Sequence, residues 1–261
     1  MKVPCGKNAE TGERIFVAEV PSGECILPLV VCPECDHPLQ AKKGKEKIHH
    51  FSHMPKIPTI KGHKEYNWKE NKASCSATPE THIHKLAKSI ITEQMKIRLP
   101  DIDFYDCLTG SGAREMLDQY SCSEGLRAID RIIRFDAISQ EQRVYMGNSY
   151  YIADIMGSIE PFNRQLTVEL ALTNIVTWEK KAKIKKAKIS AIEIKLNKEI
   201  VQHFSREQEW VTYVVDAADR YWIYNDKLDR LRQELVRFRR LHIPEDSIRK
   251  WMREFEIKVV G

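Results

Sequence analysis

CPEC at residues 32–35 and HFSH at residues 50–53 decide how the N-terminal part of this chain folds. Fourteen polar and basic residues separate the two motifs. Two thiols and two imidazoles at this spacing can close a tetrahedron around one zinc ion. We therefore predict a structural zinc site made by Cys32, Cys35, His50 and His53, in a small module that its metal stabilises.

The choice of histidines leaves an alternative open. His50 and His53 repeat the spacing of the cysteine pair, which favours them as ligands. His49 is also within reach, and His49 with His53 would give the i, i+4 spacing of two ligands on one helical face.

A lysine-rich stretch with interleaved aromatic residues surrounds the predicted zinc site. Such a surface suits a nucleic-acid backbone and an unstacked base, although a solvated loop explains the same composition. The residues concerned are Lys42, Lys43, Lys45, Lys47, Lys56, Lys61 and Lys64, with Phe51, Tyr66 and Trp68 among them.

The overall composition is that of a globular protein. The chain has 261 residues, of which 42% are hydrophobic and 30% charged, and its net charge of +5 is weaker than that of a protein that coats DNA. Its seven cysteines show no disulfide pattern. We find neither a signal peptide nor an apolar run long enough to span a membrane, so we expect a cytoplasmic protein without a membrane partner.

The pattern of apolar residues predicts a mixed α/β core. Thr78 and Pro79 begin a helix that extends to about Met95. Strands are predicted at 132–138, 150–156, 165–172 and 189–196, with a lysine-rich helix at 176–188. Further helices follow at 207–217, 226–241 and 247–255. We divide the chain into a zinc module (1–76), a core (77–200) and a helical C-terminal region (201–261).

Two carboxylates interrupt the apolar strands of this core. Asp154 and Glu169 lie on the two strands of a predicted hairpin, each between apolar residues. A charged side chain inside a sheet is costly unless it is paired or binds a metal. Two such acids could hold one Mg²⁺, which prefers oxygen ligands and keeps several waters. The alternative is that each acid lies on a solvent-exposed face of a half-buried sheet.

Together these segments resemble a known family. The CPEC and HFSH motifs are similar to the N-terminal zinc-finger-like segment of competence protein CoiA-like proteins. Glu80, His84, Lys85 and Lys88 resemble the helix that follows in that family, and residues 153–154 and 168–170 resemble its two catalytic strands. The resemblance covers about residues 25–196 and places the core in the PD-(D/E)XK superfamily.

The resemblance implies a restriction-endonuclease-like mixed sheet flanked by helices, and Mg²⁺- or Mn²⁺-dependent hydrolysis of DNA. Asp154 and Glu169 would hold the metal, and Glu80 would hold its outer waters. The superfamily pattern expects lysine two residues after the strand acid, where this chain has Ala171. Lys180 on the following helix is the nearest substitute. If no other residue replaces this lysine, the domain binds nucleic acid without cleaving it.

Two hypotheses about function follow. The first is a metal-dependent endodeoxyribonuclease in bacterial DNA uptake, mobile-element or anti-phage biology, with RNA not excluded as substrate. The second is a non-catalytic, zinc-finger nucleic-acid-binding subunit of a larger complex, with a degenerate nuclease site. In either case the C-terminal helices are candidates for contact with a protein partner or for self-association.

Overall fold

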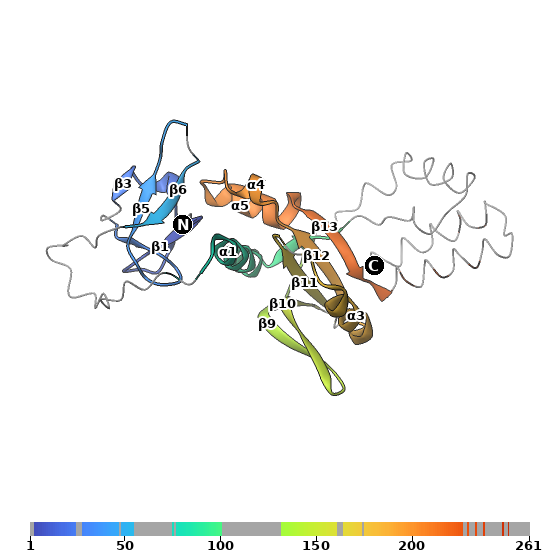
Figure 1. Cartoon of the computed structure of the whole chain (residues 1–261). Helices are drawn as coiled ribbons and strands as arrows, with labels where there is room; N and C mark the ends of the chain where they lie inside the picture. Colours follow the sequence, from blue (N-terminus) through green and yellow to red (C-terminus); the bar gives the residue numbers. More distant parts are fainter. Residues whose placement is uncertain are drawn as a thin grey trace. The chain divides into compact units, whose positions relative to one another are not determined.

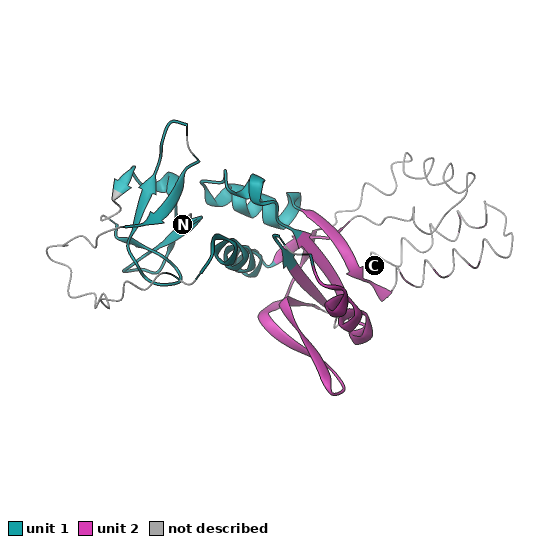
Figure 2. Ribbon diagram, viewed as in Figure 1, with its two compact units in different colours: residues 1–95, 170–175, 195–218 teal, residues 96–169, 176–194, 219–261 magenta. Residues whose placement is uncertain are grey.

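The computed structural model describes most of the chain as two compact units (Figure 2). Unit 1 contains residues 1–95, 170–175 and 195–218, and unit 2 contains residues 96–169, 176–194 and 219–261. The predicted mixed α/β class is confirmed. The residues described are 3–24, 28–46, 48–54, 75, 77–100, 132–160, 164–173, 175–226, 229, 233, 237, 247 and 250.

Unit 1 begins with two small antiparallel sheets (Figure 1). The first has the order β2-β1-β4 and the second β3-β5-β6. Phe51 and Leu39, on paired strands of the second sheet, are buried in a shared core with Val3 and Val30. The elements are β1 (Cys5–Asn8), β2 (Arg14–Phe16), the 3-10 turn η1 (Val17–Glu19), β3 (Gly23–Glu24), β4 (Val30–Val31), β5 (Leu39–Lys42) and β6 (His50–His53).

Helix α1 (Pro79–Gln94) follows the predicted start signals. The Thr78 side chain accepts a hydrogen bond from the Thr81 N–H, and Pro79 occupies the first turn, where its missing N–H costs nothing. The helix ends at Met95, which takes a left-handed conformation. Its apolar face contacts α5 (Glu207–Thr212) and the π-helical turn η3 (Tyr213–Ala217), which follow the short α4 (Lys198–Val201).

Unit 2 is built on a five-stranded sheet of order β13-β12-β11-β10-β9. The strands are β9 (Ala137–Met146), β10 (Ser149–Ile159), β11 (Arg164–Ala171), β12 (Ser190–Lys195) and β13 (Asp219–Tyr224). The ends of β11 and β12, residues 170–171 and 195, are grouped with unit 1. A separate ribbon pairs β7 (Lys96–Arg98) with β8 (Ile132–Arg134).

Helix α3 (Trp178–Ala187) connects β11 to β12 and packs against β9, β10 and β13. Ile184 is its buried anchor, in a cluster with Val144, Tyr151 and Ala191. Two hydrogen bonds connect β11 and β12. The Thr167 hydroxyl donates to the Ser190 carbonyl, and further along both strands the Leu196 N–H donates to the Ala171 carbonyl. The two strands therefore run parallel, as a helical crossover requires.

Strands β9 and β10 form a long hairpin closed by Gly147 and Asn148. Gly147 has φ of 64°, the left-handed conformation that tight hairpin turns need. Only residues 155–159 of β10 also pair with β11, so the hairpin projects beyond the rest of the sheet (Figure 1). The sequence did not predict the polar strand β9 over residues 139–146.

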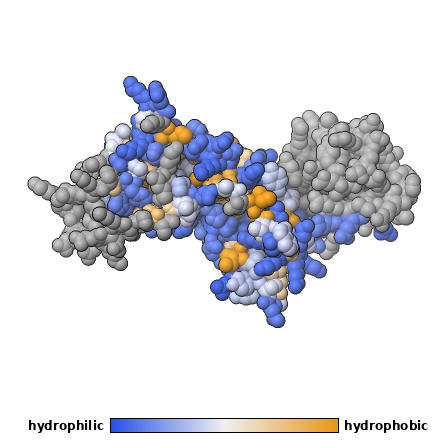
Figure 3. Space-filling view, in the orientation of Figure 1, coloured by the Kyte–Doolittle hydropathy of each residue, from blue (hydrophilic) through white to orange (hydrophobic). Residues whose placement is uncertain are grey.

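The C-terminal region is described in part. The helix predicted at 207–217 is present as α5 and η3, and β13 follows it. The helices predicted at 226–241 and 247–255 lie almost entirely outside the described residues. No helix among the described segments has the length and apolar character needed to cross a membrane. The face in Figure 3 is mostly hydrophilic, with small hydrophobic areas.

Candidate functional site

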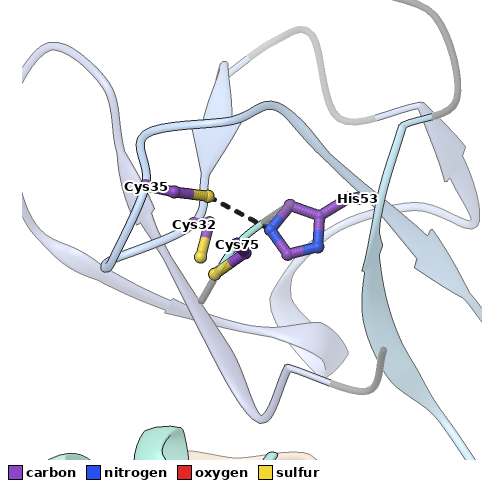
Figure 4. A group of neighbouring side chains, drawn as sticks. All are labelled: Cys32, Cys35, His53 and Cys75. Atoms are coloured by element: carbon purple, nitrogen blue, oxygen red, sulfur yellow. Dashed lines mark hydrogen bonds between the residues drawn. The ribbon is translucent and has the colours of Figure 1, made fainter. Parts of the chain in front are cut away.

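Unit 1 contains a cluster of four metal-ligating side chains, Cys32, Cys35, His53 and Cys75 (Figure 4). Their ligand atoms all lie within 4.8 Å of one another, and the Cys35 Sγ is 3.3 Å from the His53 Nε2. In a tetrahedral zinc site with Zn–S bonds of about 2.3 Å, neighbouring sulfurs lie about 3.8 Å apart. Three sulfurs and one imidazole nitrogen at this separation fit zinc, and the set is complete without an open position.

A tight turn aims the first two cysteines at the same point. The Cys32 N–H donates to the His37 carbonyl and the Asp36 N–H to the Cys32 carbonyl, at 2.8 and 3.0 Å. Asp36 takes φ of 55°, which allows the chain to reverse directly after Cys35. His53 comes from the end of β6, and Cys75 precedes α1.

Burial sets the protonation of this cluster. It lowers the pKa of the His53 imidazole to about 4, foremost by desolvation, so the ring is neutral at physiological pH and can donate a lone pair. Burial likewise raises the thiol pKa of Cys32 and of Cys35. Zinc binding must displace thiol protons here, so its affinity will fall as the solution becomes acidic.

The structure corrects one of the predicted zinc ligands. His50 is not in the cluster, and its Nδ1 instead lies 2.8 Å from the Ile48 carbonyl. His50 and His53 are three residues apart on a strand, so their side chains point to opposite faces of the sheet. Cys75, which belongs to neither motif, takes the fourth place. The HFSH motif therefore supplies one ligand.

A further buried histidine contacts the cluster from α1. The His82 Nε2 lies 3.9 Å from the Cys32 Sγ, and burial lowers the pKa of its imidazole. A neutral ring N–H can donate to a metal-bound thiolate, which is the kind of outer contact that stabilises zinc–sulfur sites. The residue links the cluster to the helix that follows it.

The lysine-rich surface is only partly available to a nucleic acid. Phe51 is fully buried in the core and cannot stack on a base. The Lys43 ammonium donates hydrogen bonds to the carbonyls of Ala18 and Val20, so this side chain has a structural role within the protein. Tyr66 and Trp68 lie outside the described residues.

In unit 2, Asp154 and Glu169 stand at the same level of neighbouring strands. The β10–β11 ladder ends at the pair Ile155 and Val168. The same register, continued by one residue, sets Asp154 opposite Glu169. The β9–β10 ladder skips Asp154 as well, and Glu141 across from it has φ of 52°. Regular pairing is therefore interrupted at Asp154, as is common beside functional sites.

Glu169 is the buried member of this pair. Its side chain is 1% exposed, and one of its oxygens, Oε1, makes no hydrogen bond within the described parts of the chain. Burial foremost raises the pKa of its carboxyl to about 7; the Lys180 ammonium opposes the rise and the Asp154 carboxylate adds to it. An oxygen left without a partner beside a second carboxylate fits a divalent cation.

Lys180 reaches this pair from the first turn of α3. Its Nζ lies 2.5 Å from the Glu169 Oε2, and the Thr177 side chain caps the helix below it. Ala171, at the position where the superfamily pattern expects lysine, is buried at the end of β11. The ammonium that contacts Glu169 thus comes from α3, at Lys180.

A second buried acid secures the start of α3. The Glu193 carboxylate on β12 accepts the Val176 N–H at 2.7 Å and lies 3.3 Å from the Lys181 Nζ. These two contacts fix the start of α3 against β12, and Lys180 lies in the first turn of that helix.

Glu80 lies in the first turn of α1 in unit 1, whereas Asp154 and Glu169 belong to unit 2. Its role at the metal therefore stays a prediction. A cavity of about 530 Å³ also belongs to unit 1, and its charged walls are occupied by ion pairs such as Arg14 with Glu93. It contains none of the predicted catalytic residues.

The comparisons with known proteins bear on the zinc segment. Residues 30–58 match the family model of the competence protein CoiA, N-terminal domain. This segment contains both motifs and three of the four clustered ligands, and the match supports the CoiA-like resemblance there. No curated protein and no solved structure is significantly similar to the chain.

Proposed function

We propose that this protein is a metal-dependent nuclease that hydrolyses phosphodiester bonds in DNA. The observation that carries the proposal is the convergence of Asp154, Glu169 and Lys180 where the β10 ladder is interrupted. Two acids and a lysine are the residue types that this chemistry requires. The restriction-endonuclease-like fold is part of the proposal, supported by the antiparallel β10–β11 pair and the α3 crossover to β12.

The electrostatics of the pair favour a cation. At neutral pH a buried Glu169 close to Asp154 carries a charge that burial penalises, and Lys180 offsets only part of that penalty. The Glu169 Oε1 and the Asp154 carboxylate are the atoms that would hold Mg²⁺ or Mn²⁺. A bound divalent cation supplies polarisation of a phosphodiester oxygen and a water of lowered pKa.

Lys180 supplies the positive charge that Ala171 cannot. Its side chain is about one quarter exposed, at 28%, so the ammonium lies at the border between the buried acid and solvent. At this place it can orient an attacking water or stabilise negative charge on the phosphorus centre. Glu193 has a different role: it positions the start of α3, the helix that carries Lys180, and does not itself contact the substrate.

The zinc module gives the proposal a biological setting. The matched family model is that of a competence protein domain, which supports a role in DNA uptake. Mobile-element and anti-phage processes are further settings within the proposal. Zinc would act as a structural ion that fixes the module and, through Cys75 and His82, the start of α1.

The test is a cleavage assay with plasmid and single-stranded DNA, with Mg²⁺, with Mn²⁺ and without either. We expect cleavage that needs the cation and is lost in Asp154→Asn, Glu169→Gln and Lys180→Ala. Lys195→Ala is the control, because Lys195 is an exposed lysine at the end of β12, away from the acid pair in sequence. Cleavage that persists at the wild-type rate in both acid variants refutes the mechanism.

The second candidate is a nucleic-acid-binding subunit with a degenerate site. Ala171 favours it, because the usual lysine position carries no functional group. It predicts salt-sensitive DNA binding without cleavage under any metal condition. Cleavage that the acid variants abolish excludes it.

A further inference from the structure

The β9–β10 hairpin presents a row of exposed aromatic and cationic side chains. Tyr145 and Tyr150 are directly paired across the two strands, and so are Arg143 and Ile152. Because side chains alternate along a strand, these four lie on one face of the hairpin. Tyr145 is 66%, Tyr150 43% and Ile152 40% exposed.

The opposite face of the hairpin is already covered. Val144, Met146 and Tyr151 point into the cluster around Ile184 of α3. Burial of the hairpin core therefore does not require the exposed row, and the fold gains little from two large aromatic residues in solvent. We call Arg143, Tyr145, Tyr150 and Ile152 the hairpin ledge.

The two rings of the ledge contact each other, and a cation lies over one of them. The ring centroids of Tyr145 and Tyr150 lie 5.8 Å apart, with an angle of 49° between the planes. The Arg143 guanidinium lies 5.3 Å from the Tyr150 ring centroid. A guanidinium held over a tyrosine ring offers both a stacking surface and a positive charge for a phosphate.

The ledge lies on the same strand as Asp154, on the face of the hairpin opposite α3, the helix that carries Lys180. Ile152 is two residues before Asp154 on β10, and Tyr150 is four residues before it. At about 3.3 Å per residue, Tyr150 lies about 13 Å from Asp154 along the strand. Unit 2 also has exposed lysines at 183, 185, 186 and 188, which attract a polyanion to this unit.

We propose that the hairpin ledge is a stacking subsite for unpaired bases, so that the substrate is single-stranded nucleic acid or a frayed duplex end. A paired base has both faces covered by its neighbours, whereas an unpaired base can lie on a tyrosine ring. This inference rests on the proposed function for the position of the scissile bond. It does not depend on that function for binding itself.

The size of the ledge favours a base over a protein surface. A stable protein interface involves about 20–30 residues from each partner. The ledge has four, and the residues of β9 that precede it, 139–142, are polar and exposed on both faces of the strand. Four side chains suffice for one or two bases.

The test measures binding without hydrolysis. A labelled single-stranded oligonucleotide and its duplex are titrated with the full-length protein in the absence of added divalent cation, and fluorescence anisotropy gives Kd. We expect wild type to prefer the single strand. Tyr145→Ala and Tyr150→Ala should each raise Kd for the single strand about fivefold or more, and change Kd for the duplex less than about twofold.

Two variants act as controls. Tyr150→Phe keeps the ring and should bind as wild type. Tyr221→Ala removes a tyrosine that is 55% exposed on β13, at the other edge of the sheet, and should have no effect. Circular dichroism should show unchanged melting for all variants, because the substituted rings are exposed.

Three results would overturn the inference: unchanged single-strand binding in both alanine variants, equal losses for single strand and duplex, or a lowered molecular mass of the variants in light scattering. The last would make the ledge a contact between copies of the chain. Cleavage data separate this inference from the proposed function. Ledge binding without cleavage refutes the nuclease alone, and cleavage without a ledge effect refutes the ledge alone.

Discussion

Replacing Glu169 by Gln should stabilise unit 2 above neutral pH while abolishing the proposed activity. The carboxyl is buried, and its pKa is raised to about 7. Above that pH the native protein contains a buried negative charge, whereas glutamine has nearly the same shape and no charge. A residue kept for cation binding at a cost in stability is the expected result of selection for function.

The structure sets the size of this effect. The carboxyl pKa is about 7 in the native protein against an ordinary value of 4.5, a difference of about 2.5. At about 1.36 kcal/mol for each pKa unit, this difference corresponds to about 3 kcal/mol. Because the native pKa is the higher one, the stability that the group contributes is complete below pH 4.5 and is lost as the pH rises through about 7.

The assay is hydrogen exchange on peptides that cover β10 and β11, at several pH values between about 4.5 and about 8. No divalent cation is added, and no chelator is used that would remove zinc. The difference in opening free energy between variant and wild type should shift by up to about 3 kcal/mol in favour of the variant. Glu179→Gln, an exposed acid on α3, is the control. A difference that stays constant with pH would refute the reasoning.

Addition of Mg²⁺ should reverse the order. A ligand that binds only the native state stabilises it by mass action, and here it must displace the Glu169 proton. We therefore expect the Mg²⁺-induced stabilisation of wild type to increase as the pH rises through about 7. The Gln variant should show little stabilisation at any pH.

Two further predictions concern the packing and the zinc site. Cys75→Ser should reduce the zinc content measured by mass spectrometry, whereas His50→Ala should retain it; the opposite result would return His50 to the ligand set. A Cβ at Gly157 would lie 2.2 Å from the Phe135 ring, so Gly157→Ala should lower the melting temperature, at a cost of about 1–3 kcal/mol. Wild-type melting would show that the ring can move.

The zinc site shows what spacing in a sequence can and cannot give. The CPEC pair has short-range geometry that a tight turn requires, so Cys32 and Cys35 were predictable. His50 looked equivalent to His53 until β6 placed them on opposite faces of a strand. Cys75 is separated from His53 by more than twenty residues, so no local pattern connects it to the cluster.

The acid pair was predictable because both residues interrupt apolar strands of one hairpin, where charge is costly. The register that brings Asp154 level with Glu169 depends on the turn between the strands and was not available from the pattern. Lys180 was selected only as the nearest lysine after Ala171; the contact with Glu169 depends on how α3 packs through Ile184.

The hairpin ledge could not have been predicted. Residues 139–143 read as polar and gave no strand signal, because this part of β9 is solvent-exposed on both faces. Without β9, Tyr145 and Arg143 have no known neighbours. Strand pairing, a long-range property, brings them beside Tyr150 and Ile152.

The most direct test of the central claim is a crystal structure of the protein soaked with Mn²⁺, examined for anomalous scattering. We predict a peak between the carboxylates of Asp154 and Glu169, with the Lys180 ammonium next to it. Absence of a peak at a Mn²⁺ concentration that supports cleavage, with Lys180 still bound to Glu169, would contradict the account.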